Sequence, residues 1–449
     1  MNMMNRINTV DAFAPMTMIR NETLILDVLG IGFGPSNIAI AIAQREIAPH
    51  LSAHFLERCP AFGWHDTMLF SHATMQVNFL KDLVSFRNPC STFSFVNFLH
   101  SNNRLADFSN LQTLFPRRVE FHQYLAWCAA QLDVGVTYGA LVTGIDYITL
   151  QAETLYRVRY TTEKGATEVY ARTLVYSGGL TPKIPFETCQ SARISHGYHI
   201  LDTLKSHAPR AHYAVVGGGQ SAAEIVQLLH EKGARVSAIV SRFGYVPADD
   251  SPFVNQLFDP DQVDPYFATT AQTRAQIYNL HATSNYAGVD LDLLKALYSN
   301  WYHGKITGDD RLTFHRMCRV TSALDTGDGV KITVQNALDA GLTDLSADYL
   351  ICATGFNKRS VLDLMSEPLR AQVSTDVAGD PVFERDYALA IRGQVSNAIY
   401  APHMTESQHG LTATLLSNMA IRSGEIVESI VARLKNSGRA AHQRELVGG

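Results

Sequence analysis

Two glycine-rich turns, far apart in the chain, constrain its fold more than any other feature. The first is Gly32-Phe-Gly34-Pro-Ser-Asn37 and the second is Gly217-Gly-Gly219-Gln-Ser-Ala222. Each turn follows a short apolar run and precedes a segment with helical spacing, which is the strand–turn–helix order of a dinucleotide-binding unit. Neither copy has the third glycine of the motif, but only small or short polar residues stand in its place. We therefore predict two dinucleotide-binding units.

A charged residue at the same distance beyond each turn distinguishes the two units. Glu57 follows the first turn and Arg242 follows the second, each just after the next apolar run. A carboxylate suits hydrogen bonds to a ribose 2′-hydroxyl, whereas a guanidinium suits a 2′-phosphate. No acid stands at Val240 or Ser241 to repel that phosphate. The pair predicts FAD in the first unit and NADPH in the second.

The composition of the 449-residue chain limits the other classes of function. A net charge of −5 gives no electrostatic case for binding nucleic acid. The six cysteines are scattered without a CxxC pair, which argues against a flavin disulfide reductase, and we expect reduced thiols. HExxH, EF-hand and GxSxG motifs are absent, so we predict no metal site and no simple hydrolase. Residues 1–22 lack the unbroken apolar run of a signal peptide, and we expect a disordered tail on a cytoplasmic protein without a membrane span.

The order of apolar segments predicts an α/β fold of two Rossmann-like domains, with the NADPH domain inserted into the FAD domain. We expect the FAD domain at 23–205 and again at 346–449, where it ends in a helix. The NADPH domain should span 206–345 and include a small, mostly helical substrate region at about 248–305. The buried run Tyr349–Ala353 is expected to be a strand of the returning FAD domain. Other expected strands are 24–31, 53–56, 173–176, 214–216 and 236–240, with more in 134–161, and expected helices are 35–44, 116–132 and 221–230.

Three polar positions have an ordinary interpretation beside a functional one. Lys81 interrupts an apolar stretch, where it either reaches solvent or binds a carboxylate or phosphate near a flavin. Asn255 and Asn285 lie in segments rich in turn formers, where an asparagine commonly satisfies backbone groups. The residues by themselves leave both interpretations open.

Read in order, the motifs resemble the flavin-dependent N-hydroxylating monooxygenases of siderophore biosynthesis, the L-ornithine N5-monooxygenase and L-lysine N6-monooxygenase family. The resemblance covers roughly residues 25–432. It rests on Gly32 to Asn37, Trp64-His65, Met75 to Asp82, Arg87-Asn-Pro89, Phe95 to His100, Gly217 to Glu224, Asp249 to Asn255, Ser284-Asn285-Tyr286, Ala353-Thr-Gly-Phe356 and His409 to Ser417.

The resemblance implies roles for single residues. It places Lys81 on the substrate carboxylate, and it implies further substrate contacts for Asn255, Asn285 and Ser417. Met75 and Gln76 are implied as catalytic residues beside the flavin and the nicotinamide. The residues implied in cofactor binding are Gly32, Gly34, Pro35, Asn37, Glu57, Trp64, His65, Gln76, Thr354, Gly355, Gly410, Leu411, Gly217, Gly219, Gln220, Ser221 and Arg242.

The resemblance also implies the reaction. NADPH reduces FAD, O2 forms a C4a-hydroperoxyflavin, and a neutral primary amine attacks the distal oxygen, so the cofactor performs the difficult chemistry. L-Ornithine is the expected substrate and N5-hydroxyornithine, for a hydroxamate siderophore, the expected product. The resemblance further implies a homo-oligomer, in particular a tetramer.

Departures from the family pattern leave the identity of the amine open. Ala287 and Gly288 stand where the family often has serine and valine, and Phe356 stands where it usually has tyrosine. Histamine, L-lysine and a diamine are therefore alternative substrates. Two alternative functions belong to other classes of protein. A flavin monooxygenase acting on sulfur or carbon would share both nucleotide folds, whereas a non-catalytic nucleotide-binding protein would bind FAD without oxidising NADPH.

Overall fold

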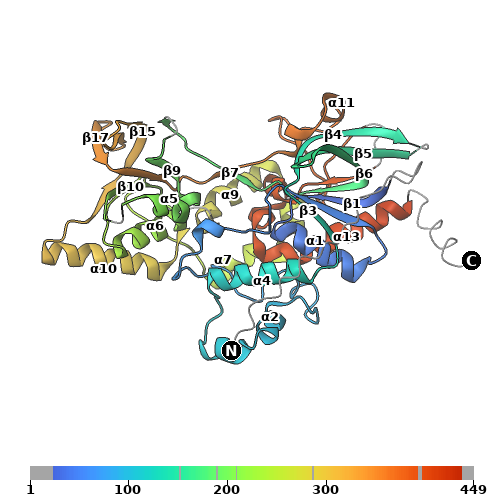
Figure 1. Ribbon diagram of the computed structural model, residues 1–449, viewed down its shortest axis with the longest axis horizontal. Coiled ribbons are helices and arrows are strands. Elements are labelled where there is room, and N and C mark those ends of the chain that lie inside the picture. The colour runs from blue at the N-terminus through green and yellow to red at the C-terminus, as the bar shows by residue number, and fades with distance from the viewer. Residues whose placement is uncertain are drawn as a thin grey trace, which may run out of the picture.

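The computed structural model describes residues 24–150, 153–188, 191–208, 210–285, 288–392 and 397–436, without the side chains of 282–285. The tail expected at 1–22 and Cys189 lie outside these ranges. The chain forms two lobes, each built on its own β-sheet, with helices between and below them (Figure 1). Within the described ranges, no helix is long and apolar enough to cross a membrane.

The first lobe is built on a seven-stranded sheet with the order β3-β2-β1-β6-β5-β4, in which β20 also pairs with β6. The bounds are β1 Ile25–Ile31, β2 Ala53–Glu57, β3 Gly135–Tyr138, β4 Leu141–Leu150, β5 Glu153–Thr162, β6 Gly165–Tyr176 and β20 Ile399–Tyr400. β1, β2, β3, β6 and β20 are parallel, and β4 and β5 continue the sheet antiparallel. Because β2 lies on one side of β1 and β6 on the other, the carboxyl ends of β1 and β6 form a topological switch point, where open α/β sheets bind ligands.

Helices cover the first sheet from below in the view of Figure 1. α1 (Pro35–Ile47) packs against α13 (Met419–Asn436) and against α4 (Arg118–Gln131). Pro35 suits the first position of α1, because its φ is already helical and no amide donor is needed there. The adjoining residues 37–44 are all buried, which explains their nearly continuous run of Ile and Ala. The shorter α2 (Phe95–Ser101) and α3 (Leu105–Asn110) precede α4.

The second lobe is built on a five-stranded parallel sheet with the order β14-β11-β10-β18-β9. Its bounds are β9 Ile194–His196, β10 His212–Val216, β11 Arg235–Val240, β14 Leu312–Arg316 and β18 Tyr349–Cys352. α5 (Ile200–Ser206), α6 (Gln220–Glu231) and α10 (Leu291–Thr307) share an apolar core with this sheet. A smaller sheet, ordered β17-β16-β15-β8, adjoins it: β8 Glu187–Thr188, β15 Cys318–Asp325, β16 Val330–Asn336 and β17 Leu342–Ala347.

The expected placement of the strand at 349–353 is wrong. β18 pairs with β10 and β9 of the second sheet, and the chain returns to the first sheet only at β20, where Ile399 pairs with Leu174. β9 is also part of the second sheet, although residues 194–196 fall within the first predicted domain. An apolar run signals a buried parallel strand, but it does not say which of two similar sheets the strand enters.

The other predicted strands and helices lie within a few residues of their expected bounds, except that the strand expected at 173–176 is the end of the longer β6. The region expected to be helical contains α7 (Pro252–Asn255), α8 (Val263–Ala268) and α9 (Ala271–Asn285), flanked by the paired strands β12 (Val246–Pro247) and β13 (Gly288–Val289). Near the end of the described chain lie α11 (Glu367–Arg370) and α12 (Glu406–His409).

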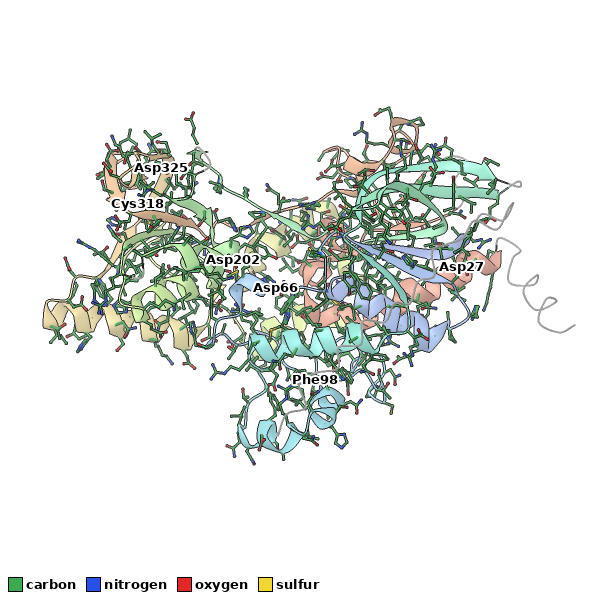
Figure 2. All side chains as sticks on the ribbon, in the orientation of Figure 1. Asp27, Asp66, Phe98, Asp202, Cys318 and Asp325 are labelled. Carbon is green, nitrogen blue, oxygen red and sulfur yellow. The ribbon has the colours of Figure 1, made fainter. Side chains whose placement is uncertain are left out.

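Two connections between the lobes pair with each other. β7 (Leu180–Pro182) follows the first sheet, β19 (Phe356–Lys358) returns from the second, and the two are antiparallel neighbours. A third segment between the lobes contains the 3-10 helix η1 (Asp66–Met68), and Figure 2 shows Asp66 there. The lobes are therefore joined by a short ribbon as well as by the helical region.

Candidate functional site

The first glycine turn is tied to the strands on both of its sides. The Gly32 amide donates to the Leu56 carbonyl of β2 at 2.8 Å, and the Ser177 amide after β6 donates to the Ile31 carbonyl at 2.8 Å. Gly32 has φ +87°, in the left-handed region that favours glycine. Gly34 directly precedes α1, and a Cβ added to it would have no heavy atom within 4 Å. The turn therefore presents bare backbone and a helix N-terminus to open space, which suits a pyrophosphate.

The second turn repeats this construction. The Gly217 amide donates to the Ile239 carbonyl of β11 at 3.2 Å, and the Ala353 amide after β18 donates to the Val216 carbonyl at 2.8 Å. Gly217 has φ +151°. The next residue, Gly218, again has open space where a Cβ would lie. The two backbone hydrogen bonds that fix the first turn therefore have direct counterparts in the second turn.

Glu57 lies where the first unit needs an acceptor. Its carboxylate accepts hydrogen bonds from the Phe33 amide at 2.7 Å and from the Cys59 amide at 2.8 Å. These bonds hold the half-buried carboxylate at the carboxyl end of β2, beside the glycine turn. An ionised carboxylate has about four acceptor sites, which is more than the two amides use, so it can still accept from a ribose hydroxyl.

Asn37, predicted to bind the cofactor, is fully buried beneath the first turn. Its amide nitrogen donates to the Gly32 carbonyl at 2.6 Å and lies 3.3 Å from the Ile31 carbonyl, while its oxygen accepts from the Ser177 hydroxyl at 3.2 Å. We therefore propose that Asn37 supports the turn and does not contact the cofactor directly.

In the second unit, Gln220 and Arg242 have different surroundings. The Gln220 amide nitrogen donates to Glu224 at 2.9 Å, and its oxygen accepts from the Asp290 amide at 2.9 Å, so this side chain bonds to protein. Ser221 follows it in the first turn of α6. Arg242 is half-buried just after β11, and no described residue forms an ion pair with its guanidinium. A guanidinium left unpaired at this end of the sheet suits a phosphate.

The segment carrying Met75 and Gln76 runs beside the start of α4. The Met75 amide donates to the Pro116 carbonyl at 2.8 Å, and the Phe79 amide donates to the Leu114 carbonyl at 2.9 Å. Met75 is buried in the apolar core of the first lobe, whereas Gln76 is exposed. Of the two predicted catalytic residues, only Gln76 therefore presents its side chain to solvent.

Lys81 follows on the same segment, next to a buried carboxylate that fixes the local backbone. Asp82 is buried, and its carboxylate accepts from the amides of Val84, Ser85 and Phe95 at 2.9, 2.6 and 2.7 Å, as well as from the Ser85 hydroxyl. Burial raises the pKa of Asp82, and these hydrogen bonds oppose the shift. Lys81 itself is half-buried and has no ion pair among the described residues, so its ammonium is available to pair with a carboxylate.

The predicted substrate asparagines lie in the helical region. Asn255 ends α7, and its amide nitrogen donates to the Asp250 carbonyl at 2.7 Å, as the ordinary interpretation of a loop asparagine expects. Its amide oxygen makes no hydrogen bond within the described chain and can still accept one. Asn285 ends α9, but its side chain lies outside the described part, as do residues 286 and 287 altogether.

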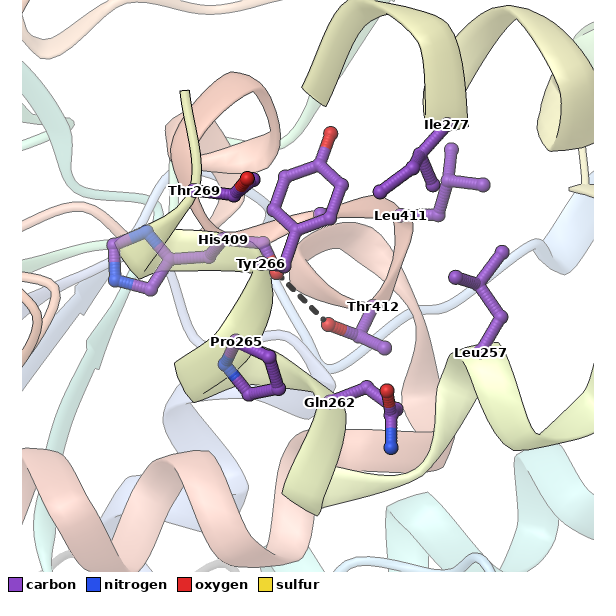
Figure 3. A pocket seen from close by; sticks show the side chains of 10 residues that line it. Leu257, Gln262, Pro265, Tyr266, Thr269, Ile277, His409, Leu411 and Thr412 are labelled. Atoms are coloured by element: carbon purple, nitrogen blue, oxygen red, sulfur yellow. Dashed lines mark hydrogen bonds between the residues drawn. The ribbon is translucent and has the colours of Figure 1, made fainter. Parts of the chain in front are cut away.

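Segment 409–417 connects the helical region to the first lobe. A cavity of about 160 Å³ lies between this segment, α8 and α9 (Figure 3). Gly410 and Leu411, both predicted to bind cofactor, line it together with Tyr266, and Gly410 has φ +85°. Ser417 is buried, and the preceding Leu416 packs on the core that contains Met75. The segment thus contacts the core that contains Met75 on one side and, through Leu257, the turn that follows Asn255 on the other.

Sequence reasoning missed Arg422 of α13, which holds this segment in place. Its side chain is 4% exposed, and its guanidinium donates to the carbonyls of Thr412 and Ala413 at 3.1 and 2.7 Å. Burial lowers its pKa. A basic residue in an amphipathic helix carries no signal of burial when its partners are backbone carbonyls of another segment.

Trp64 and His65 lie between the lobes, just before η1. Their rings are 4.6 Å apart edge to face, and the His65 ring is 6.2 Å from Tyr198 of the second lobe. Burial, together with the charges of Arg118 and His122, lowers the pKa of His65 to about 4, so this imidazole is neutral at neutral pH. Their role in cofactor binding stays a prediction, which this place at the boundary supports.

Thr354 and Gly355 belong to the ribbon between the lobes. The Thr354 hydroxyl donates to the Lys183 carbonyl, and the Gly355 carbonyl accepts from the Lys183 amide at 3.0 Å and from the His196 ring at 2.9 Å. Both predicted cofactor residues therefore have structural hydrogen bonds, and their contact with a cofactor stays a prediction.

The residues present fit two different dinucleotides. Each turn offers open backbone amides, with an acceptor beside the first and a cation beside the second. No group of three or more His, Cys, Asp or Glu in the described ranges could hold a metal ion. The described cysteines are free. This fold and these two sites define the class of two-dinucleotide oxidoreductases.

Within that class, the chain belongs to the L-lysine 6-monooxygenase/L-ornithine 5-monooxygenase family, whose model matches residues 24–358. The L-ornithine N(5)-monooxygenase of Pseudomonas aeruginosa is 36% identical over 96% of this chain and 100% of its own length. The ornithine N-hydroxylase structure from Kutzneria sp. 744 is 39% identical and covers 91% of this chain and 100% of that chain, with a TM-score of 0.88. The L-lysine 6-monooxygenase structure from Pseudomonas syringae is 28% identical and covers 91% and 100%, with a TM-score of 0.78. The resemblance predicted from the motifs is confirmed.

Proposed function

We propose that this protein uses FAD and NADPH to hydroxylate the side-chain amine of L-ornithine, giving N5-hydroxyornithine for a hydroxamate siderophore. The observation that carries the proposal is the pair of equivalent turns, with Glu57 beside one and Arg242 beside the other. The Kutzneria relative holds reduced FAD, NADP+ and L-ornithine, and the P. aeruginosa relative is named for L-ornithine.

The protein's own residues bind and orient the reactants. FAD, when bound, supplies the activation of O2 after reduction by NADPH. The first turn and Glu57 hold FAD, while the second turn and Arg242 hold NADPH. Gln76, exposed on the segment beside α4, is the residue we place next to both cofactors.

Substrate selection depends on Lys81. Its unpaired ammonium binds the α-carboxylate of ornithine, which favours an amino acid over histamine or a diamine. Asn255, Asn285 and Ser417 supply further polar contacts. The reacting amine must be neutral to offer a lone pair, so the site must lower the pKa of an amine whose ordinary value is that of lysine, which burial does.

The decisive experiment measures coupled turnover across amines. Purified holoenzyme is given NADPH and O2 with L-ornithine, L-lysine, histamine or putrescine, and both NADPH oxidation and hydroxylamine product are quantified. We expect nearly one product per NADPH with L-ornithine and mostly uncoupled oxidation with the others. Stoichiometric product from histamine alone would overturn the choice of ornithine. A sulfoxide or ester product would indicate the sulfur or carbon monooxygenase, and FAD binding without NADPH oxidation the non-catalytic protein.

The proposal also includes the assembly and the compartment. We propose a cytoplasmic homo-oligomer, with the tetramer taken from the resemblance to the family. Light scattering of the holoenzyme measures the mass directly, and a monomeric mass would remove this part of the proposal without affecting the reaction.

A further inference from the structure

A bidentate ion pair joins the two nucleotide-binding lobes. The guanidinium of Arg118, in the first turn of α4, donates to both oxygens of Glu224 in α6, at 2.9 and 2.7 Å. Both side chains are largely buried, and Glu224 is only 2% exposed. α4 packs on the first lobe and α6 on the second, so the pair forms only when the lobes are in this arrangement.

The pair extends into a chain of hydrogen bonds on both sides. Arg118 also donates to the Met68 carbonyl of η1 at 3.0 Å, and the Met68 side chain is buried in the core of the second lobe. On the second-lobe side, Glu224 accepts from Gln220 at 2.9 Å, and Gln220 accepts from the Asp290 amide at 2.9 Å. Gln220 is the first residue of α6, directly after the second glycine turn. Asp290 caps α10 and follows β13 at the end of the helical region. The chain therefore links the first lobe, the second glycine turn and the helical region.

The geometry makes this contact specific. A buried carboxylate is costly without a partner, and a planar guanidinium that bonds both oxygens fixes orientation as well as distance. Because Glu224 lies one turn inside α6, a shift of the second lobe would break the pair and displace the turn that holds the nicotinamide nucleotide. Arg235 and Asp310 form a contrasting pair on the second lobe, 3.4 Å apart and exposed, which can contribute little.

We propose that Arg118 and Glu224 are positioning residues that lock the NADPH-binding lobe against the FAD-binding lobe, and that Gln220 passes this constraint to the nucleotide turn. The inference rests on the proposed function, because it assigns the pair to hydride transfer from NADPH to FAD. It adds a role for two residues that contact neither the amine nor the reacting atoms.

The test measures flavin reduction by NADPH in anaerobic holoenzyme, followed by flavin absorbance after rapid mixing. The variants are Arg118→Gln, Glu224→Gln, the double variant, and Arg118→Lys, which keeps the charge but loses the bidentate geometry. Misplaced reactants commonly cost about 10- to 100-fold in rate, and we expect each single variant to slow reduction by about that factor. The double variant should be no slower than the worse single one, because removing both charges leaves none buried alone. Arg118→Lys should recover only part of the rate.

Two controls separate positioning from stability. Arg235→Gln/Asp310→Asn removes the exposed pair of the same lobe and should leave the reduction rate unchanged. FAD content and thermal midpoint are measured for every variant, and reoxidation by O2 after dithionite reduction should stay at the wild-type rate. Single variants that lose stability but are reduced within about twofold of the wild-type rate, or that act additively, would overturn the inference. If NADPH fails to reduce the wild-type flavin, the proposed function itself fails, which is a distinguishable outcome.

Discussion

A Cβ added to Gly32 would lie 2.4 Å from the carbonyl oxygen of Ser177. The second unit repeats this relationship, since a Cβ on Gly217 would lie 2.4 Å from the carbonyl oxygen of Ala353. In each unit the backbone just after the neighbouring strand, β6 or β18, passes directly against the first glycine of the turn. The first glycine of each turn is therefore required by packing, whereas Gly34 of the first turn and Gly218 of the second face open space.

This difference predicts opposite outcomes for two neighbouring substitutions. Gly32→Ala combines a positive φ with a backbone clash, so we expect little folded holoenzyme. Gly34→Ala has a φ of −84° and no nearby atom, so it should fold with nearly unchanged stability but bind FAD more weakly. Thermal midpoint and flavin content after gel filtration check both variants. Equal loss of folding in the two would contradict this account of the turn.

Arg242 should decide between the two nicotinamide nucleotides. A charge-assisted contact is worth about 1.5–3 kcal/mol, so Arg242→Gln should raise the KM for NADPH by roughly 10- to 100-fold and leave the KM for NADH nearly unchanged. Arg235→Gln is a matched control, since Arg235 lies at the other end of β11. A variant that lost both nucleotides equally would point to a structural role for Arg242.

Lys81 should determine how strongly the enzyme prefers an amine substrate that carries a carboxylate. Lys81→Met is expected to raise the KM for L-ornithine by roughly 10- to 100-fold, because it removes one charge-assisted pair. Putrescine lacks the carboxylate, so the variant and the wild type should use it equally poorly. Flavin reduction by NADPH without substrate should not change. An equal loss for both amines would show that Lys81 shapes the site without binding the carboxylate.

Buried neutral histidines should make stability depend on pH. His409 is 1% exposed, and burial first, then the charges of Arg385 and Arg422, lower its pKa from 6.5 to about 4. Between these values the unfolded chain binds a proton that the native state does not, so stability falls as the pH falls from 6.5 toward 4 and is unaffected above. The full effect of this one group is about 3 kcal/mol.

Urea unfolding of holoenzyme at several pH values between 7.5 and 4.5, with FAD in excess, measures this dependence. We expect His409→Gln to be less stable at pH 7.5 but to lose less stability on acidification than the wild type. Burial also lowers the pKa values of His65 and His403 to about 4, so part of the pH dependence of stability should persist in His409→Gln. An unchanged slope in His409→Gln would contradict the assignment.

Much of the fold was predictable because its signals are local. Apolar runs ending at glycine predicted β1 and β10, and the charged residue after the next run predicted the places of Glu57 and Arg242. The role of Asn37 was less predictable, since a short polar residue at that position suits a cofactor contact and a buried support equally well. Its bonds to Gly32 and Ser177 favour the proposed supporting role, and a contact with the cofactor stays a prediction.

The sequence by itself predicted two nucleotide-binding units with opposite charges beside their turns, because turn, helix start and charged residue lie within one short stretch in each. Only the tertiary structure decided that β18 joins the second sheet, that Arg422 holds the carbonyls of Thr412 and Ala413, and that Arg118 meets Glu224 across the lobes. The physical reason is that these contacts join segments that are far apart in the sequence. Some of them also use backbone atoms, which every residue carries, so no local sequence pattern predicts them.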